Sequence, residues 1–300
     1  MMRDIRESSY NRRTVLQTTG AALAAGTVGL AGCFGGNSTT LTFGIVPAED
    51  NMDVVEQWGP VGDHVQESTD ADIEFFEATS YSGIIESMAN DNVDIAWYGP
   101  FAYVLAHERA GAEAILIQKD GETGDEAYQT FWTTYHEDIN GIDDMEGTSV
   151  AFADPASASG YLIPSYMVLQ EGYDPDEFFG ETSFAGGHSS AQITLANEQI
   201  DIAPSASFVY RNMVKDGEIN PDHNRVIVES EPIPLTPIAV HPDIDDDLRQ
   251  QLVDAFTSFD DEETLDELGT AGWTETDDSE YDVIRDVQST LDEAGYEVGL

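Results

Sequence analysis

Residues 93–108 read VDIAWYGPFAYVLAHE. The first six residues of this stretch, Val93–Tyr98, are apolar except for Asp94, which is typical of a short buried strand. Gly99 and Pro100 end that strand, and a proline favours the first turn of a helix, which we expect to run to Ala110. A buried strand followed directly by a helix indicates an α/β sheet whose faces are covered by helices.

The same alternation extends in both directions from this stretch. Short apolar runs alternate with segments of helical periodicity, a second series begins near residue 131, and a strand is expected at 199–203. The proline-rich segment 231–237 indicates a return of the chain toward the first series. We predict an α/β protein of two lobes, each a mostly parallel sheet flanked by helices, with a cleft at the carboxyl ends of the strands. The expected boundaries are 41–130 plus 238–300 for lobe 1 and 131–237 for lobe 2.

Residues 1–32 have the pattern of an export signal. An Arg12-Arg13 pair precedes an apolar run that is too short to span a membrane, as in twin-arginine signals. The run ends in Leu-Ala-Gly-Cys33, which is similar to a lipobox, and Cys33 is the only cysteine of the chain. We predict export by the twin-arginine route, lipidation of Cys33 that anchors the protein outside the cell membrane, and a flexible tether at 33–40. Asn37 within that tether is a candidate glycosylation site.

The charge balance is strongly acidic. The chain has 59 Asp and Glu against 11 Lys and Arg, for a formal net charge of −48, which excludes binding to nucleic acid or to anionic lipid. Hydrophobic residues nevertheless make up 41% of the chain, a fraction typical of a globular protein. An acidic, lysine-poor surface is typical of halophiles, since molar salt shortens the screening length to about 3 Å. Together with the signal, this composition predicts a halophilic archaeal lipoprotein.

Three segments place hydroxyl groups and small residues where a strand ends and a helix begins: 79–82, 157–160 and 186–189. The first amides of a helix lack partners within it, and the helix dipole favours an anion there. A single segment of this kind is explained by helix capping, but three in one cleft predict an anion site. Tyr98, which follows the buried strand, is expected to point its hydroxyl into the cleft. His188 is expected to act as a hydrogen-bond donor to an oxyanion.

The sequence shows no pattern that indicates an enzyme or a cofactor. Neither Ser157 nor Ser159 lies in a G-x-S-x-G elbow, and the six histidines have no metal-binding spacing. Glycine-rich nucleotide loops are absent as well. We therefore expect a binding protein without catalytic residues, metal or cofactor.

Three motifs, in this order, resemble the phosphate/phosphite/phosphonate-binding proteins of ABC transporters: residues 93–108, 154–164 and 184–188. The resemblance covers nearly the whole chain after the signal. It implies a two-lobed periplasmic-binding fold of type II, an ABC permease with its ATPase as partners, and a monomer. Carried over residue by residue, it implies these ligand contacts: Tyr81, Tyr98, Ser157, Ala158, Ser159, His188 and Thr236.

The chain departs from the family pattern at three of the compared positions. Ala158 stands where the family often has Thr, so one hydroxyl is missing. Phe208 or a neighbour and Thr236 stand where members that bind aminophosphonates carry acids. A ligand without an amine is therefore expected: phosphate, phosphite or a simple alkylphosphonate.

Other functions stay open at this point. A receptor for a thiamine precursor or an organic sulfonate would have the same two-lobed architecture. A secreted phosphoester hydrolase would use Ser159 with His188, and a sensor domain would report ligand occupancy to a signalling partner.

Overall fold

The computed structural model describes residues 39–46, 54–296 and 298–299. These residues belong to one compact unit, so the division into lobes at residues 130 and 237 stays a prediction. The predicted twin-arginine signal, Cys33 and Asn37 lie outside the described residues. Within the described part, no helix has both the length and the apolar character needed to cross a membrane.

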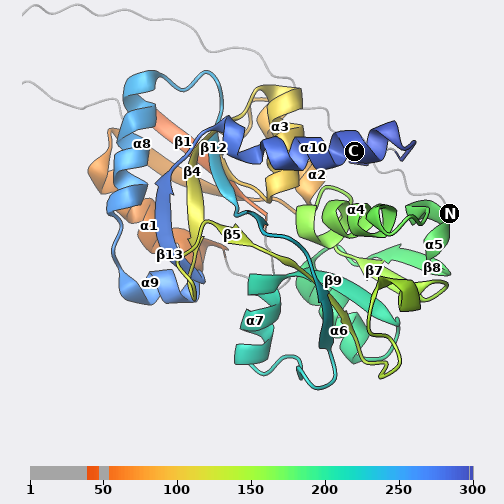
Figure 1. Cartoon of the computed structure of the whole chain (residues 1–300). Coiled ribbons are helices and arrows are strands. Elements are labelled where there is room, and N and C mark those ends of the chain that lie inside the picture. The colour runs from red at the N-terminus through yellow and green to blue at the C-terminus, as the bar shows by residue number, and fades with distance from the viewer. Residues whose placement is uncertain (1–38, 47–53, 297, 300) are drawn as a thin grey trace, which may run out of the picture. The chain divides into compact units, whose positions relative to one another are not determined.

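The predicted α/β class is confirmed, with two main sheets covered by helices (Figure 1). One sheet has six strands in the order β13-β4-β12-β3-β1-β2, and the other has five in the order β10-β6-β9-β7-β8. The strands of the six-stranded sheet are β1 Thr39–Ile45, β2 Ala71–Glu77, β3 Ile95–Trp97, β4 Glu113–Asp120, β12 Pro237–Val240 and β13 Thr270–Glu275. Those of the five-stranded sheet are β6 Thr130–Thr134, β7 Ser149–Phe152, β8 Glu181–Phe184, β9 Ile202–Ala206 and β10 Arg225–Glu229.

Both sheets are mixed rather than mostly parallel, which corrects the prediction. In the six-stranded sheet β1 runs parallel to β2 and β3, but β12 is antiparallel to β3 and β4, and β13 is antiparallel to β4. In the five-stranded sheet β7 runs parallel to β8 and β9, whereas β6 is antiparallel to β9 and β10. Two of the antiparallel strands, β6 and β12, enter their sheets directly after the chain has passed from one sheet to the other. The third, β13, follows α8 and α9.

Two short segments carry the chain between the sheets. Strand β5, Ala127–Tyr128, precedes the five-stranded sheet, and β11, Ile233–Pro234, follows it. They pair antiparallel, with Tyr128 opposite Ile233, and form a two-stranded ribbon of their own.

Helices cover the faces of both sheets. Their bounds are α1 Val54–Ser68, α2 Tyr81–Ala89, α3 Pro100–Ala110, α4 Ile163–Gln170, α5 Pro175–Phe178, α6 His188–Ala196, α7 Ser207–Lys215, α8 Asp246–Ser258, α9 Glu262–Glu267 and α10 Asp282–Glu293. Two 3₁₀ turns, η1 Ile142–Met145 and η3 Asp278–Tyr281, and a π-helical turn, η2 Ala158–Leu162, complete the described elements. Helix α10 packs against α3 and α4, and therefore bridges the two series of elements (Figure 1).

Some elements differ from those expected. The first strand begins at Thr39, whose amide donates to the Asp70 carbonyl, so Thr39 and Thr40 belong to β1 and not to the tether. The strand expected at 199–203 lies at Ile202–Ala206, and α7 follows it at once without having been predicted. Helix α9 was also missed, because its acidic residues resemble a solvated loop; Asp261 caps it by accepting from the Thr264 amide at 2.9 Å.

The apolar core of the described residues forms separate clusters, and one of them contains residues from both sheets. Aromatic rings fill the six-stranded side, where Phe43 meets Trp58 at 5.3 Å and Trp58 meets Trp97 at 5.8 Å between ring centroids. A second cluster joins side chains of α3 to side chains of η2 and α7. Each large apolar side chain buried there contributes about 1.5–3 kcal/mol, so the cluster holds the ends of these helices in place.

Candidate functional site

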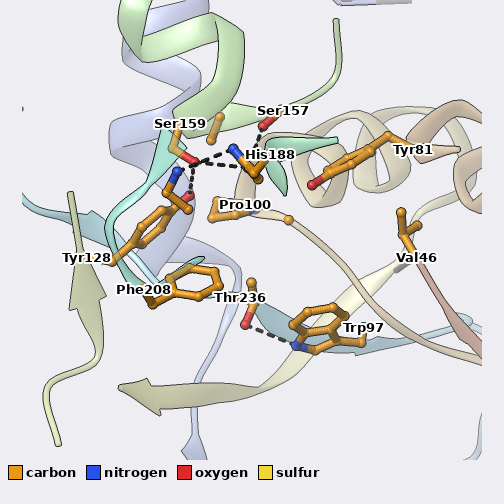
Figure 2. Close-up of a pocket in the computed structure, with 13 residues that line it drawn as sticks. Val46, Tyr81, Trp97, Pro100, Tyr128, Ser157, Ser159, His188, Phe208 and Thr236 are labelled. Atoms are coloured by element: carbon orange, nitrogen blue, oxygen red, sulfur yellow. Dashed lines mark hydrogen bonds between the residues drawn. The ribbon is translucent and has the colours of Figure 1, made fainter. Parts of the chain in front are cut away.

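A narrow pocket lies where elements of the two sheets meet (Figure 2). Its volume for the centre of a water molecule is about 20 Å³, enough for about one water. Any larger ligand therefore requires its walls to move apart. Among the described residues, these line it: Val46, Tyr81, Trp97, Gly99, Pro100, Tyr128, Ser157, Ala158, Ser159, His188, Ala206, Phe208 and Thr236.

The pocket gathers the N-termini of five helical segments. Tyr81, Pro100 and His188 are the first residues of α2, α3 and α6. Ser157 caps η2, and Ala206 is the N-cap residue of α7. Each helix end carries about half a positive elementary charge, so the five together favour a negative charge between them. The sequence indicated three of these ends, and the structure adds α3 and α7.

His188 is buried, with 4% of its surface exposed, and it is held as a neutral hydrogen-bond donor. The Ala206 amide donates to Nδ1 at 3.3 Å, so Nδ1 carries no proton. Burial lowers the pKa of His188 to about 4, which leaves the ring neutral with its proton on Nε2. Nε2 lies 3.4 Å from Ser157 Oγ and 3.5 Å from Ser159 Oγ. The imidazole therefore directs an N–H group toward the two serines.

The two serines are fixed by the turn that carries them. Ser157 Oγ accepts a hydrogen bond from the Gly160 amide at 3.1 Å, and Tyr128 Oη donates to Ser159 Oγ at 3.3 Å. A Cβ at Gly160 would lie 2.4 Å from Ala153 Cβ and 2.8 Å from Ser157 Oγ. Only glycine fits there, because the turn passes directly under the serine and the imidazole.

Two tyrosines add hydroxyl groups that stay protonated. Burial raises the pKa of Tyr81, and the nearby Asp154 charge raises it further. Burial likewise raises the pKa of Tyr128. Asp154 does not line the pocket; its Oδ1 accepts from the Ala156 amide at 2.8 Å, while burial raises its pKa. Both phenols thus remain donors over the whole physiological pH range.

The opposite side of the pocket is less polar. Trp97 Nε1 donates to Thr236 Oγ1 at 3.0 Å, and Thr236 in turn donates to Gln118 Oε1 at 2.6 Å. The Thr236 hydroxyl is therefore already satisfied within the protein. The ring of Phe208 contacts that of Tyr128, at 5.2 Å between centroids. Figure 2 shows Ser157, Ser159 and His188 on one side and Phe208, Thr236 and Trp97 on the other.

Six of the seven residues predicted to contact a ligand line this pocket: Tyr81, Ser157, Ala158, Ser159, His188 and Thr236. The seventh, Tyr98, does not line the pocket in this structure, and its role as a ligand contact stays a prediction. Tyr98 is fully buried in the core, and its hydroxyl has no hydrogen-bond partner. Successive residues of an extended chain face opposite sides, and here Trp97 takes the pocket side. Trp97 and Tyr128 line the pocket without having been predicted. An apolar strand residue such as Trp97 carries no signal for its side, and Tyr128 is placed by its pairing in the ribbon between the sheets.

The chemistry of the site is that of an uncharged hydrogen-bonding pocket. Of the described lining residues, none is Lys, Arg, Asp or Glu. Elsewhere in the described part, no group of three His, Cys, Asp or Glu side chains is placed to hold a metal ion. Hydroxyl, imidazole and amide donors beside five helix ends can bind an anion through several hydrogen bonds, each worth about 1.5–3 kcal/mol when the acceptor is ionised.

Solved structures show the same fold. A binding protein component of an ABC phosphonate transporter from Pseudomonas aeruginosa is 26% identical, with a TM-score of 0.77 over 85% of this chain and 87% of that one. PhnD1 from Prochlorococcus marinus in complex with methylphosphonate is 16% identical, with a TM-score of 0.75 over 86% of this chain and 100% of that one.

Sequence comparisons identify the family. The phosphate-import protein PhnD of Mycolicibacterium smegmatis is 32% identical over 65% of this chain, and the match spans 64% of that protein, just under two thirds. The phosphonates-binding periplasmic protein of Escherichia coli is 26% identical over 82% of this chain and 75% of that protein. Residues 43–281 match a family model described as ABC transporter, phosphonate, periplasmic substrate-binding protein. The chain therefore belongs to the family of phosphonate-type periplasmic substrate-binding proteins of ABC transporters.

Proposed function

We propose that the protein is the extracytoplasmic substrate-binding component of an ABC importer, and that it captures a small phosphorus oxyanion without an amine. The observation that carries this proposal is the convergence of five helix N-termini with the hydroxyls of Tyr81, Ser157 and Ser159 and the N–H of His188. An ABC permease and its ATPase would receive the ligand. Family membership supports this role, as do relatives named for phosphate import and phosphonate binding.

The absence of an amine from the ligand follows from the charges of the pocket. An ammonium group buried without a carboxylate partner loses several kcal/mol of hydration. Phe208 and Thr236 supply no negative charge, and no other described lining residue does. Phosphate, phosphite and methylphosphonate carry oxyanion oxygens and, at most, one further hydroxyl, hydrogen or methyl group. None of them has an ammonium group, so each matches the charges of the pocket.

A hydrolase that uses Ser159 and His188 is less well supported. A general base must have its unprotonated ring nitrogen toward the serine, and an acid normally holds the other N–H. Here the Ala206 amide donates to Nδ1, so the nitrogen facing the serines carries the proton. The imidazole can donate to an oxyanion but cannot accept the serine proton.

The proposed location and assembly rest on the sequence. Export by the twin-arginine route, lipidation of Cys33 and anchoring to the cell membrane would place the protein beside its permease. The acidic surface is adverse to nucleic acid. A monomer is proposed, because receptors of this kind dock singly.

The test is a calorimetric titration of methylphosphonate into the wild type and three variants in molar KCl. Tyr81→Phe and Ser159→Ala each remove one pocket hydroxyl, and we expect each to weaken binding about 10- to 100-fold. Tyr98→Phe is the matched control: it removes a buried hydroxyl that has no partner and does not line the pocket, so affinity should not change. Equal affinities in all four proteins would contradict the proposed site.

A further inference from the structure

A second, much larger cavity shares a lining residue with the pocket. Its volume for the centre of a water molecule is about 550 Å³, against about 20 Å³ for the pocket. We call it the outer cavity; among the described residues these line it: Asp120, Gly121, Glu122, Phe208, Tyr210, Arg211, Asn212, Val214, Lys215, Pro221, Leu265, Asp266, Gly269 and Thr270. Of the described residues, Phe208 alone lines both cavities.

The Phe208 side chain forms an apolar part of the pocket wall. It is the second residue of α7, on the side opposite the serines and His188 (Figure 2). Its ring packs edge-to-face on Tyr128, with an interplanar angle of 63°. A phosphorus oxyanion whose oxygens face the donors directs its remaining substituent away from them. In this pocket that direction leads toward the side that carries Phe208.

Helix α7 is tied to its neighbours by several polar contacts, so Phe208 does not move independently of them. At its start, the Ser207 amide donates to the Gln129 carbonyl at 2.9 Å, and the Gln129 amide donates to Ser207 Oγ at 3.2 Å. One turn later, Arg211 pairs with Asp120 and, at 2.7 Å, with Glu122. Asp120 is only 3% exposed, so a shift of α7 would leave a buried carboxylate without its cation.

We propose that Phe208 is the specificity-determining residue of the pocket, and that its ring limits the size of the phosphorus substituent by closing the pocket from the outer cavity. This inference rests on the proposed function. Without the ring, the two cavities join, and a bulky substituent gains room that the wild type does not offer. A wall that does not adapt discriminates between ligands by excluding the bulky substituent. The resulting preference can exceed the 10- to 200-fold discrimination that about one methylene group produces in a pocket that adapts.

The test compares methylphosphonate with phenylphosphonate in the wild type, Phe208→Ala, Phe208→Leu and Val214→Ala by calorimetric titration in molar KCl. We expect the wild type to prefer methylphosphonate at least about 100-fold. Phe208→Ala should reduce that preference at least about tenfold, and Phe208→Leu should have an intermediate effect. Val214 lines only the outer cavity on the same helix, so Val214→Ala should leave the preference unchanged.

The outcomes separate the two proposals. In one outcome, the wild type binds methylphosphonate while both Phe208 variants keep the wild-type preference for methylphosphonate over phenylphosphonate. In that case the proposed function stands and the proposed role of Phe208 is refuted. An equal fall in preference in Val214→Ala would also refute it, since the effect would then belong to the helix and not to the ring. If the wild type binds neither compound while folded, both proposals fail. Should Phe208→Ala not fold, Phe208→Leu alone decides, because a leucine still leaves part of the passage open.

Discussion

Replacing His188 with Gln should make the protein's stability less dependent on pH. At about pH 7.5 the imidazole is neutral in both the folded and the unfolded state. At about pH 5 the unfolded ring, with its ordinary pKa of 6.5, is mostly protonated, whereas the folded ring, with a pKa of about 4, stays neutral. The unfolded state then binds more protons, so the free energy of unfolding falls as the pH falls.

The size of the effect follows from the two pKa values. Linkage gives a loss of about 2 kcal/mol between about pH 7.5 and pH 5, and about 3 kcal/mol by pH 4. Below the folded pKa of about 4 the folded ring is protonated too, so the loss levels off. In His188→Gln this contribution is absent, whereas every other titrating group is common to both proteins.

The assay is urea unfolding of both proteins in molar KCl at several pH values from about 7.5 to 4. The substitution itself adds an offset that does not vary with pH, so the informative quantity is the change in the difference between the two proteins. We expect the wild type to lose about 2 kcal/mol more than the variant on going to about pH 5. A difference that stays constant over this range would show that His188 titrates alike in both states, and would refute its assignment as a buried neutral donor.

Two further predictions concern the packing around the site. Gly160→Ala should lower the free energy of unfolding by about 1–3 kcal/mol, because the new Cβ would lie 2.4 Å from Ala153 Cβ. Gly141→Ala, at an extended position with no atom within 4 Å of the new Cβ, should change it by less than about 0.5 kcal/mol in the same thermal melts. Arg211→Gln should cost about 1–3 kcal/mol, since Asp120 is nearly buried, whereas Lys215→Gln should cost less than about 1 kcal/mol, since both partners of its ion pair are exposed. Equal losses in the members of either pair would contradict the packing or the ion pair described above.

Sequence patterns predicted the part of the fold in which local signals are strong. Residues 93–110 form the expected strand, turn and helix, because the apolar run and the Gly99-Pro100 break act over a few residues. Strand direction was not predictable in the same way. Whether β12 joins β3 parallel or antiparallel depends on the path of the chain between the sheets, which no local pattern encodes.

In the site, too, residues with a local sequence signature were predictable, and residues placed by tertiary contacts were not. Ser157 and His188 were found because hydroxyl and imidazole groups at helix starts have a local signature. Tyr98 was expected at the cleft but does not line the pocket, since the residue pattern of a strand that is buried on both faces does not distinguish the two faces. Tyr128 was missed because it reaches the pocket from the ribbon between the sheets, where only tertiary pairing with β11 places it.

The central claim is that the pocket binds a phosphorus oxyanion and provides no charge for an amine. The most direct measurement is a calorimetric comparison of ethylphosphonate with aminomethylphosphonate, which are nearly equal in size and differ by a methyl in place of an ammonium group. We expect ethylphosphonate to bind at least about 100-fold more tightly, since a buried ammonium without a carboxylate costs several kcal/mol. Tighter binding of aminomethylphosphonate would contradict this claim and would show that the pocket presents a negative charge to its ligand.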